Sequence, residues 1–182
     1  MLLAILLAVS MCVTARAVAF GQMASADEVK AAFLFNFAKF VEWPSDAAPS
    51  GTPLVLGVLG NEAVEESLRT VTRGKSIDGH QLSVKRLTNG DDATRVHLLF
   101  LGITDRTRMA DVLRRVDGIS VLTVSDVDRF CQSGGVIALS MEDSRVRFDV
   151  NLDAAERGRL KLSSKLLSLA RTVHSTRASG DR

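Results

Sequence analysis

Two aspartates, Asp126 and Asp128, directly follow an apolar segment in the middle of the chain. That segment, residues 119–124, predicts a buried strand, and open α/β sheets bind ligands beyond the carboxyl ends of such strands. Two carboxylates at this point could bind Mg²⁺ or a small molecule. The alternative is that Asp126 caps a short helical turn that runs to Cys131, which explains the same residues without a ligand and is the simpler hypothesis.

Cys131 is the second residue with chemistry of its own. No His or Lys stands near it in the sequence to lower its pKa. We expect a free, slow-reacting thiol that acts as a small buried hydrophobe. An intermolecular disulfide or a reactive thiol is the alternative, because exported proteins usually pair their cysteines.

Other catalytic patterns are missing from the sequence. The histidines His80, His97 and His174 stand singly, with no neighbour at metal-ligand spacing. No serine lies in a G-x-S-x-G elbow, and the turn at residues 57–60 lacks the G-x-G-x-x-G pattern of a dinucleotide loop. We therefore expect a protein that is not an enzyme and that carries no cofactor and no metal.

Length, charge and the N-terminal segment indicate where the protein works. The 182 residues have room for one domain, and a net charge of +2 leaves no basic patch for nucleic acid. The apolar run 2–13 is too short to span a membrane, and Ala17-Val18-Ala19 offers the small residues that signal peptidase requires. We expect a signal peptide over residues 1–19, a single domain over 20–182, and export to the periplasm.

The stretch VKAAFLFNFAKFVEWP, residues 29–44, concentrates the aromatic residues of the chain. On a helical wheel Asn36, Lys39 and Glu42 share one narrow stripe, and Lys30 stands alone near the start. The rest of the circumference is apolar, which is wider than a surface helix needs. A helix ending at Trp43-Pro44 is predicted, because residues before proline avoid the helical region. Such a helix is either core or half-covered by a partner protein, and the candidate partner-binding residues are Asn36, Lys39, Phe40, Glu42 and Trp43.

Alternating strands and helices are predicted around this segment. Together they predict an α/β fold, a three-layer sandwich of a mainly parallel sheet with helices on both faces. An antiparallel C-terminal hairpin at 136–150 is expected at the edge of the sheet, with Phe148 facing inward and Arg147 outward. The expected strands are 54–59, 82–87, 96–101 and 119–124, and the expected helices are 62–71 (capped by Asn61), 107–116 and 163–178 (capped by Ser163).

Three segments together resemble one family. They are VKAAFLFNFAKFVEWP, VLTVSDVDRFCQSGGVIAL and VRFDVNLDAAERGRLKLSSKLLSLA. Their order and spacing are similar to those of the YfiR-like periplasmic proteins, over essentially the whole chain after the signal segment. The resemblance implies an α/β fold, a homodimer, and a repressor that binds the periplasmic part of an inner-membrane diguanylate cyclase and holds it inactive. Release of such a repressor raises cyclic di-GMP and favours biofilm formation.

The cysteines depart from the family pattern. Some members close a short loop with a disulfide that begins where Cys131 stands, and the second position here is Ala138. Others have a cysteine where this chain has Val96. Redox control through those disulfides is therefore not expected. Two hypotheses follow, a regulator of a membrane signalling enzyme or a periplasmic small-molecule sensor that uses the strand end near Asp126.

Overall fold

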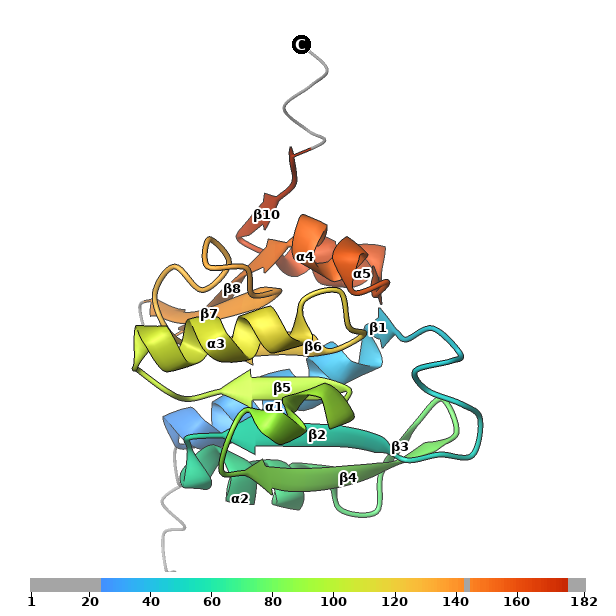
Figure 1. Cartoon of the computed structure of the whole chain (residues 1–182). Helices are drawn as coiled ribbons and strands as arrows, with labels where there is room; N and C mark the ends of the chain where they lie inside the picture. The colour runs from blue at the N-terminus through green and yellow to red at the C-terminus, as the bar shows by residue number, and fades with distance from the viewer. Residues whose placement is uncertain (1–23, 143–144, 177–182) are drawn as a thin grey trace, which may run out of the picture.

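The main element of the fold is a twisted sheet, and most of its strands run parallel (Figure 1). The computed structural model describes residues 24–142 and 145–176, so the expected signal peptide lies outside the described residues. Within them the main sheet has eight strands in the order β10-β8-β7-β6-β5-β2-β4-β3. Their bounds in that order are Thr172–His174, Arg145–Asn151, Ile137–Glu142, Leu122–Ser125, Leu98–Leu101, Leu54–Leu59, His80–Leu87 and Ser76–Ile77.

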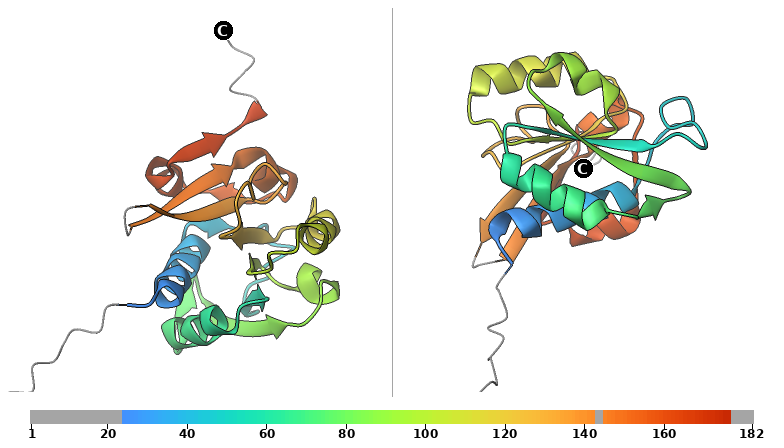
Figure 2. Two further views of the ribbon diagram at one scale, coloured as in Figure 1. Left: turned by 90° about the vertical axis from the view of Figure 1, so that its left-hand side faces the viewer. Right: turned by 90° about the horizontal axis from the view of Figure 1, so that it is seen from below.

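Helices cover both faces of this sheet, which confirms the predicted three-layer α/β sandwich (Figure 2). Helices α1 (Ala26–Lys39) and α2 (Glu62–Thr72) lie on one face. Residues of α4 (Leu152–Arg157) and α5 (Ser164–Leu169) belong to the same core cluster as theirs. The other face carries α3 (Arg106–Val116) and the 3₁₀ helix η1 (Asp91–Arg95). A separate antiparallel pair joins β1 (Val41–Glu42) to β9 (Lys161–Leu162).

Alternation along the central strands divides the core into two clusters. In β5, Leu98 and Phe100 pack in the cluster that includes α1 and α2, whereas Leu99 and Leu101 pack in the cluster that includes α3. All four side chains are fully buried. Because this strand is covered on both faces, its sequence is a continuous apolar run rather than an alternating one.

The turn between β2 and α2 has a structural explanation. Gly60 has φ +90°, and a Cβ there would lie 2.5 Å from Cγ2 of Ile103. Asn61 caps α2 as predicted, since its side chain accepts a hydrogen bond from the Val64 amide at 2.9 Å. Positive φ and close packing therefore account for the glycine at this turn without a bound nucleotide.

The antiparallel pair β7–β8 lies at the predicted side of the sheet. Phe148 is only 5% exposed and packs edge to face against Phe37 of α1, with ring centroids 5.1 Å apart. Arg147 is exposed, as the alternation predicts. The short strand β10, which was not predicted, runs parallel to β8 outside the hairpin.

The structure corrects two of the predicted helix ends. Helix α1 ends at Lys39 rather than Trp43, because Val41 pairs with Leu162 in the small sheet and draws the chain out of the helix. The C-terminal helix begins after its Ser163 cap as expected but ends at Leu169 instead of residue 178. The Arg171 amide donates to the Phe148 carbonyl at 2.8 Å, and the chain continues as β10.

Smaller differences concern short elements. Residues 126–131 form turns rather than a helical turn, so Asp126 caps no helix. Strand β5 begins at Leu98, which places His97 just before it, and β6 begins at Leu122. The segments α4, η1 and β3 were not predicted, because each is too short for a hydrophobic period to be recognisable.

Candidate functional site

The predicted partner-binding residues lie around the C-terminal end of α1. Asn36 and Lys39 are exposed on the helix, and Glu42 is exposed on β1, so the polar stripe faces solvent although Glu42 is not helical. The opposite side of the helix buries Leu34 and Phe37 in the core. The helix is therefore core on one side and open on the other.

Two half-buried phenylalanines flank the exposed side of this helix. At 100° per residue, Phe35 and Phe40 lie on either side of Lys39 and Asn36. The Lys75 and Lys39 ammonium groups lie 4.6 and 5.6 Å from the centre of the Phe35 ring. Lys165 of α5 lies 5.5 Å from the Phe40 ring centre. We call this group the aromatic–lysine surface; its residues are Phe35, Asn36, Lys39, Phe40, Lys75 and Lys165.

Trp43 anchors the segment that follows α1. Its indole Nε1 donates a hydrogen bond to the His97 carbonyl at 3.1 Å, and its ring packs edge to face on the His97 ring at 6.1 Å. The indole is half-buried by these contacts. Trp43 therefore ties the segment after α1 to the start of β5, beside the aromatic–lysine surface.

Asp126 and Asp128, which follow β6, do not converge on a common position for a ligand. Lys30 of α1 contacts Asp126 at 2.7 Å and Asp27 at 3.3 Å. Burial lowers the pKa of Lys30, but the two carboxylates raise it more, so the net direction is upward. Asp128 is exposed, and the described residues contain no group of three His, Cys, Asp or Glu that could hold a metal ion. The cation that pairs with Asp126 is thus Lys30 of the protein itself.

Cys131 lies inside the domain. Its Sγ is 3.5 Å from the Asp149 carbonyl oxygen and 3.7 Å from that of Val136. Burial raises the pKa of the thiol to about 11. It forms no disulfide within the described part of the chain. These surroundings disfavour the thiolate that reactive cysteines need.

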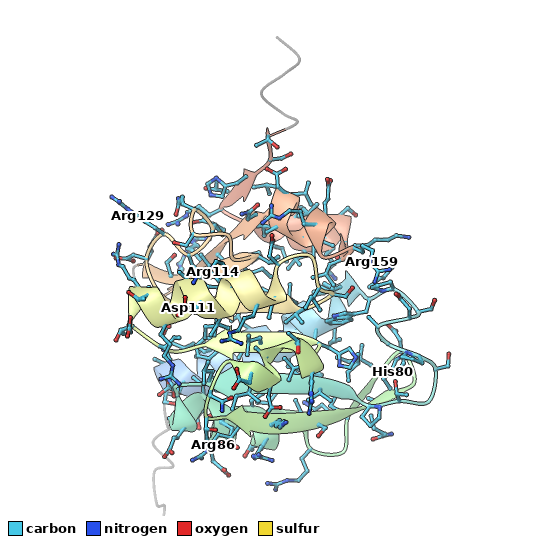
Figure 3. All side chains as sticks on the ribbon, viewed as in Figure 1. His80, Arg86, Asp111, Arg114, Arg129 and Arg159 are labelled. Carbon is cyan, nitrogen blue, oxygen red and sulfur yellow. The ribbon has the colours of Figure 1, made fainter. Side chains whose placement is uncertain are left out.

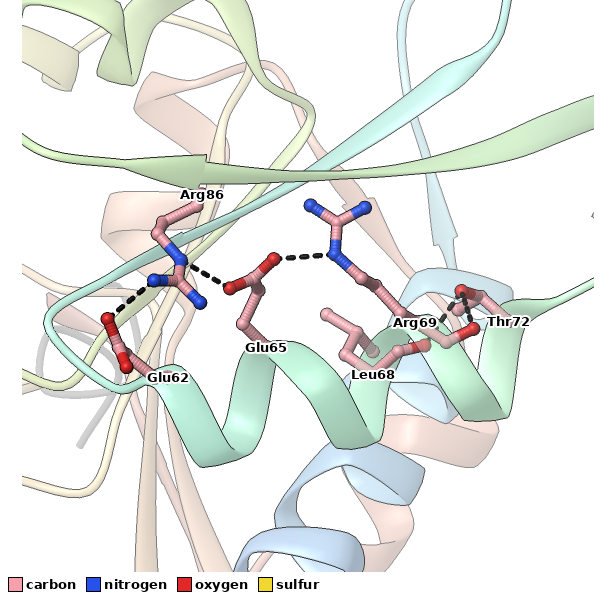
Figure 4. A network of polar contacts seen from close by, with 6 residues as sticks. All are labelled: Glu62, Glu65, Leu68, Arg69, Thr72 and Arg86. Carbon is pink, nitrogen blue, oxygen red and sulfur yellow. Dashed lines mark hydrogen bonds and ion pairs between the residues drawn. The ribbon is translucent and has the colours of Figure 1, made fainter.

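A buried carboxylate joins α2 to β4 (Figure 4). Glu65 is 4% exposed at its side chain and accepts hydrogen bonds from Arg69 at 2.5 Å and from Arg86 at 2.6 Å. Arg86 also pairs with the exposed Glu62. Burial would raise the pKa of Glu65, but the two guanidinium groups lower it more, so its pKa lies below the ordinary value. This network is structural, because its buried carboxylate is fully occupied by internal donors.

A second apolar surface was missed in the sequence. Leu169 is 62% exposed, and Val173 of β10 is also exposed. In the predicted helix 163–178 both belong to the apolar residues of an amphipathic helix, and the sequence period alone is compatible with that arrangement. Their exposure follows from the change to a strand after α5, which depends on pairing with β8.

A solved structure of similar fold agrees with this architecture. A Vibrio cholerae protein described as a conserved domain protein has a TM-score of 0.54 and 12% identity, covering 82% of this chain. This chain spans 60% of the length of that protein, and at this identity the match concerns the fold alone. The ABC domain from Streptococcus pneumoniae, solved in complex with L-Trp, gives a TM-score of 0.47 at 8% identity, over 66% of this chain and 55% of that one.

No helix among the described residues is long and apolar enough to cross a membrane. The model of the YfiR/HmsC-like family (DUF4154) matches residues 27–171, which include α1, the whole sheet up to β8, and the open side of α1 described above. The chain belongs to the YfiR/HmsC-like family.

Proposed function

We propose that this protein is a periplasmic repressor that binds the periplasmic region of an inner-membrane diguanylate cyclase and lowers cyclic di-GMP. Membership in the YfiR/HmsC-like family supports the class of function, regulation of such cyclases from the periplasm. Binding rather than catalysis is the proposed activity, and the protein reaches its partner after removal of residues 1–19.

The observation that carries this proposal is the aromatic–lysine surface. Phe35 and Phe40 remain half-buried beside exposed Lys39 and Asn36, although the core contact of α1 is already made by Leu34 and Phe37. Aromatic side chains are frequent anchors of protein interfaces, and long lysine stems cover apolar surface until a partner replaces them. The surface thus combines two aromatic side chains with lysines that lie between and beside them.

Charge reversal at Lys39 on this surface and at the nearby Glu42 tests the proposal. Deleting the gene should raise cyclic di-GMP, and the native gene should restore the low level. The double variant Lys39→Glu/Glu42→Lys should fold but fail to restore it, because the charges at both positions are inverted. A matched control is Asp111→Arg/Arg114→Asp, an exposed ion pair with the same three-residue spacing on α3, across the sheet (Figure 3). Unchanged cyclic di-GMP on deletion would exclude the regulatory role.

A homodimer is part of the proposal, as the family resemblance implies. The exposed Leu169, which ends α5, and the exposed Val173 of the edge strand β10 support it, because exposed apolar side chains at an unpaired sheet edge favour association. Light scattering on the purified protein measures the oligomeric state. The double variant Leu169→Lys/Val173→Lys should shift the mass toward the monomer if this edge carries the dimer.

A further inference from the structure

A cavity of about 420 Å³ lies at the amino ends of β5 and β6, at the opposite end of these strands from Asp126. It is lined by Asp46 and Ala47 after α1, by residues 94–97 and 118–121, and by Arg159. Its volume falls in the range of small-molecule sites. Neither the family match nor the proposed partner surface assigns it a role.

Two arginine residues line the cavity. Arg95 is 78% exposed at its side chain and has only a distant ion pair, at 3.7 Å, with an Asp92 carboxylate that Lys85 also contacts. Arg159 forms a two-pronged contact with Asp46, at 2.8 and 3.3 Å. Hydrogen bonding from Arg159 lowers the pKa of Asp46. Because two arginines and one aspartate line the cavity, its lining carries an excess of positive charge.

A buried hydroxyl without a partner lies in the cavity wall. Ser120 is 7% exposed, and its Oγ has no hydrogen-bond partner among the described residues. Ser140 is the other described residue whose buried hydroxyl has no hydrogen-bond partner, but it does not line this cavity. Buried hydroxyl groups are normally paired, because an unmade hydrogen bond costs the desolvation of the group. The acceptor oxygen of a ligand would complete the pairing of Ser120.

The backbone at Arg159 gives an independent reason to look for a role of its side chain. Arg159 has φ +57°, the left-handed conformation that normally favours glycine or asparagine. The preceding Gly158 packs so closely on the cavity wall that a Cβ would lie 2.8 Å from the Ile119 carbonyl oxygen. A glycine at position 159 would adopt this φ without backbone strain. The feature that arginine has and glycine lacks is the guanidinium group.

We propose that this cavity binds a small anion, a carboxylate or a phosphate, between Arg95 and Arg159, with the Ser120 hydroxyl as a further donor. The anion competes with Asp46 for the guanidinium of Arg159. Asp46 follows Trp43 closely in the chain, so occupation of the cavity loosens the segment next to the aromatic–lysine surface. The inference goes beyond the proposed function, since the site would exist whatever protein the chain binds.

Calorimetric titration of the purified protein with inorganic phosphate and, separately, with succinate tests this site at constant ionic strength. Arg95→Gln and Arg159→Gln should each weaken binding by about tenfold, the loss of one charge-assisted contact. Asp46→Asn should strengthen it, because the internal competitor loses its charge. Arg114→Gln on α3, an equally exposed arginine with its own aspartate, is the matched control and should bind as the native protein does.

Ser120→Ala separates a ligand role from a structural one. Removing an unpaired hydroxyl should leave the Tm of the free protein unchanged or higher, yet weaken anion binding. The preferred probe identifies the ligand as phosphate-like or carboxylate-like. Absence of saturable binding of both probes would overturn the proposal, and so would binding that persists unchanged in Arg95→Gln and Arg159→Gln.

Discussion

Glu65 illustrates how a single residue carries stability at a position without a functional role. Its carboxylate is buried and held by two arginines from different elements, Arg69 on α2 and Arg86 on β4. An ion pair on the surface contributes little, but removing the charge of a buried one leaves its partners uncompensated. Glu62 meets the same Arg86 but not Arg69, and it is 80% exposed at its side chain, so it differs from Glu65 in burial and in its number of partners.

Glu65→Gln should therefore lower the free energy of unfolding by about 2–3 kcal/mol at pH 7. The pKa of Glu65 is lowered on folding, so its contribution is present above the ordinary value of 4.5 and is lost as pH falls through the folded pKa. Urea unfolding at several pH values measures both effects. Glu62→Gln is the control and should change stability by under about 0.5 kcal/mol. A similar loss in both variants would mean that burial does not decide the effect.

Cys131 should behave as a free thiol that reacts only after unfolding. Burial raises its pKa to about 11, so almost no thiolate is present at pH 7. Titration with a thiol reagent should give slow labelling of the native protein and one fast equivalent in denaturant. Rapid native labelling, or no thiol after unfolding, would contradict this expectation and support the redox alternative.

At the scale of elements, strands were more predictable than short helices. The continuous apolar segments of β2 and β5 fit only burial on both faces, and the structure places them at the centre of the sheet. The exposure of Asn36 and Lys39 likewise followed from the helical wheel. By contrast, the apolar spacing of Leu166, Leu169 and Val173 fits a helix as well as the actual helix and strand. Hydrogen bonding to β8 decides between them.

The cation–π contacts of the site depend on tertiary structure in the same way. Lys75 and Lys165 reach Phe35 and Phe40 from other elements, and no local spacing indicates these contacts. Arg95 and Arg159 meet at one cavity from opposite halves of the chain. Sequence patterns locate residues on faces, but only packing of the elements brings distant residues together.

The β7–β8 hairpin allows a direct test of the assigned faces. Phe148 lies in the core against Phe37, so Phe148→Ala should lower the free energy of unfolding by about 3–5 kcal/mol. Arg147 lies on the exposed face, and Arg147→Ala should be near neutral. Chemical denaturation of both variants compares them. Equal destabilisation would show that the two faces have been assigned wrongly.

At the scale of the whole molecule, His97 links the segment after α1 to the centre of the sheet. Its Nδ1 accepts from the Val55 amide at 2.9 Å, and its Nε2 lies 3.0 Å from the Ala47 carbonyl. An amide N–H can only donate, so the ring is neutral with its proton on Nε2. The His97 carbonyl also accepts from Trp43. His97 thus holds the segment that borders both the aromatic–lysine surface and the cavity, in addition to the contact of Asp46 with Arg159.

This arrangement predicts that mild acid destabilises the fold through His97. Burial lowers the pKa of His97 below its ordinary 6.5, and the contact with Ala47 only partly opposes this. The stabilisation is therefore complete above about pH 6.5 and is lost as pH falls through the folded pKa, because a proton on Nδ1 removes the acceptor for Val55.

Thermal unfolding between pH 8 and pH 5 measures the effect. The native protein should lose Tm over this range, whereas His97→Gln should have a lower Tm at pH 8 and a smaller further loss. His174→Gln on β10 is the matched control and should keep the full acid response, because β10 is the edge strand and β8, β7 and β6 separate it from β5. If His97→Gln keeps the whole acid-induced drop in Tm, another group fastens the segment, and the cavity and the partner surface are not joined through His97.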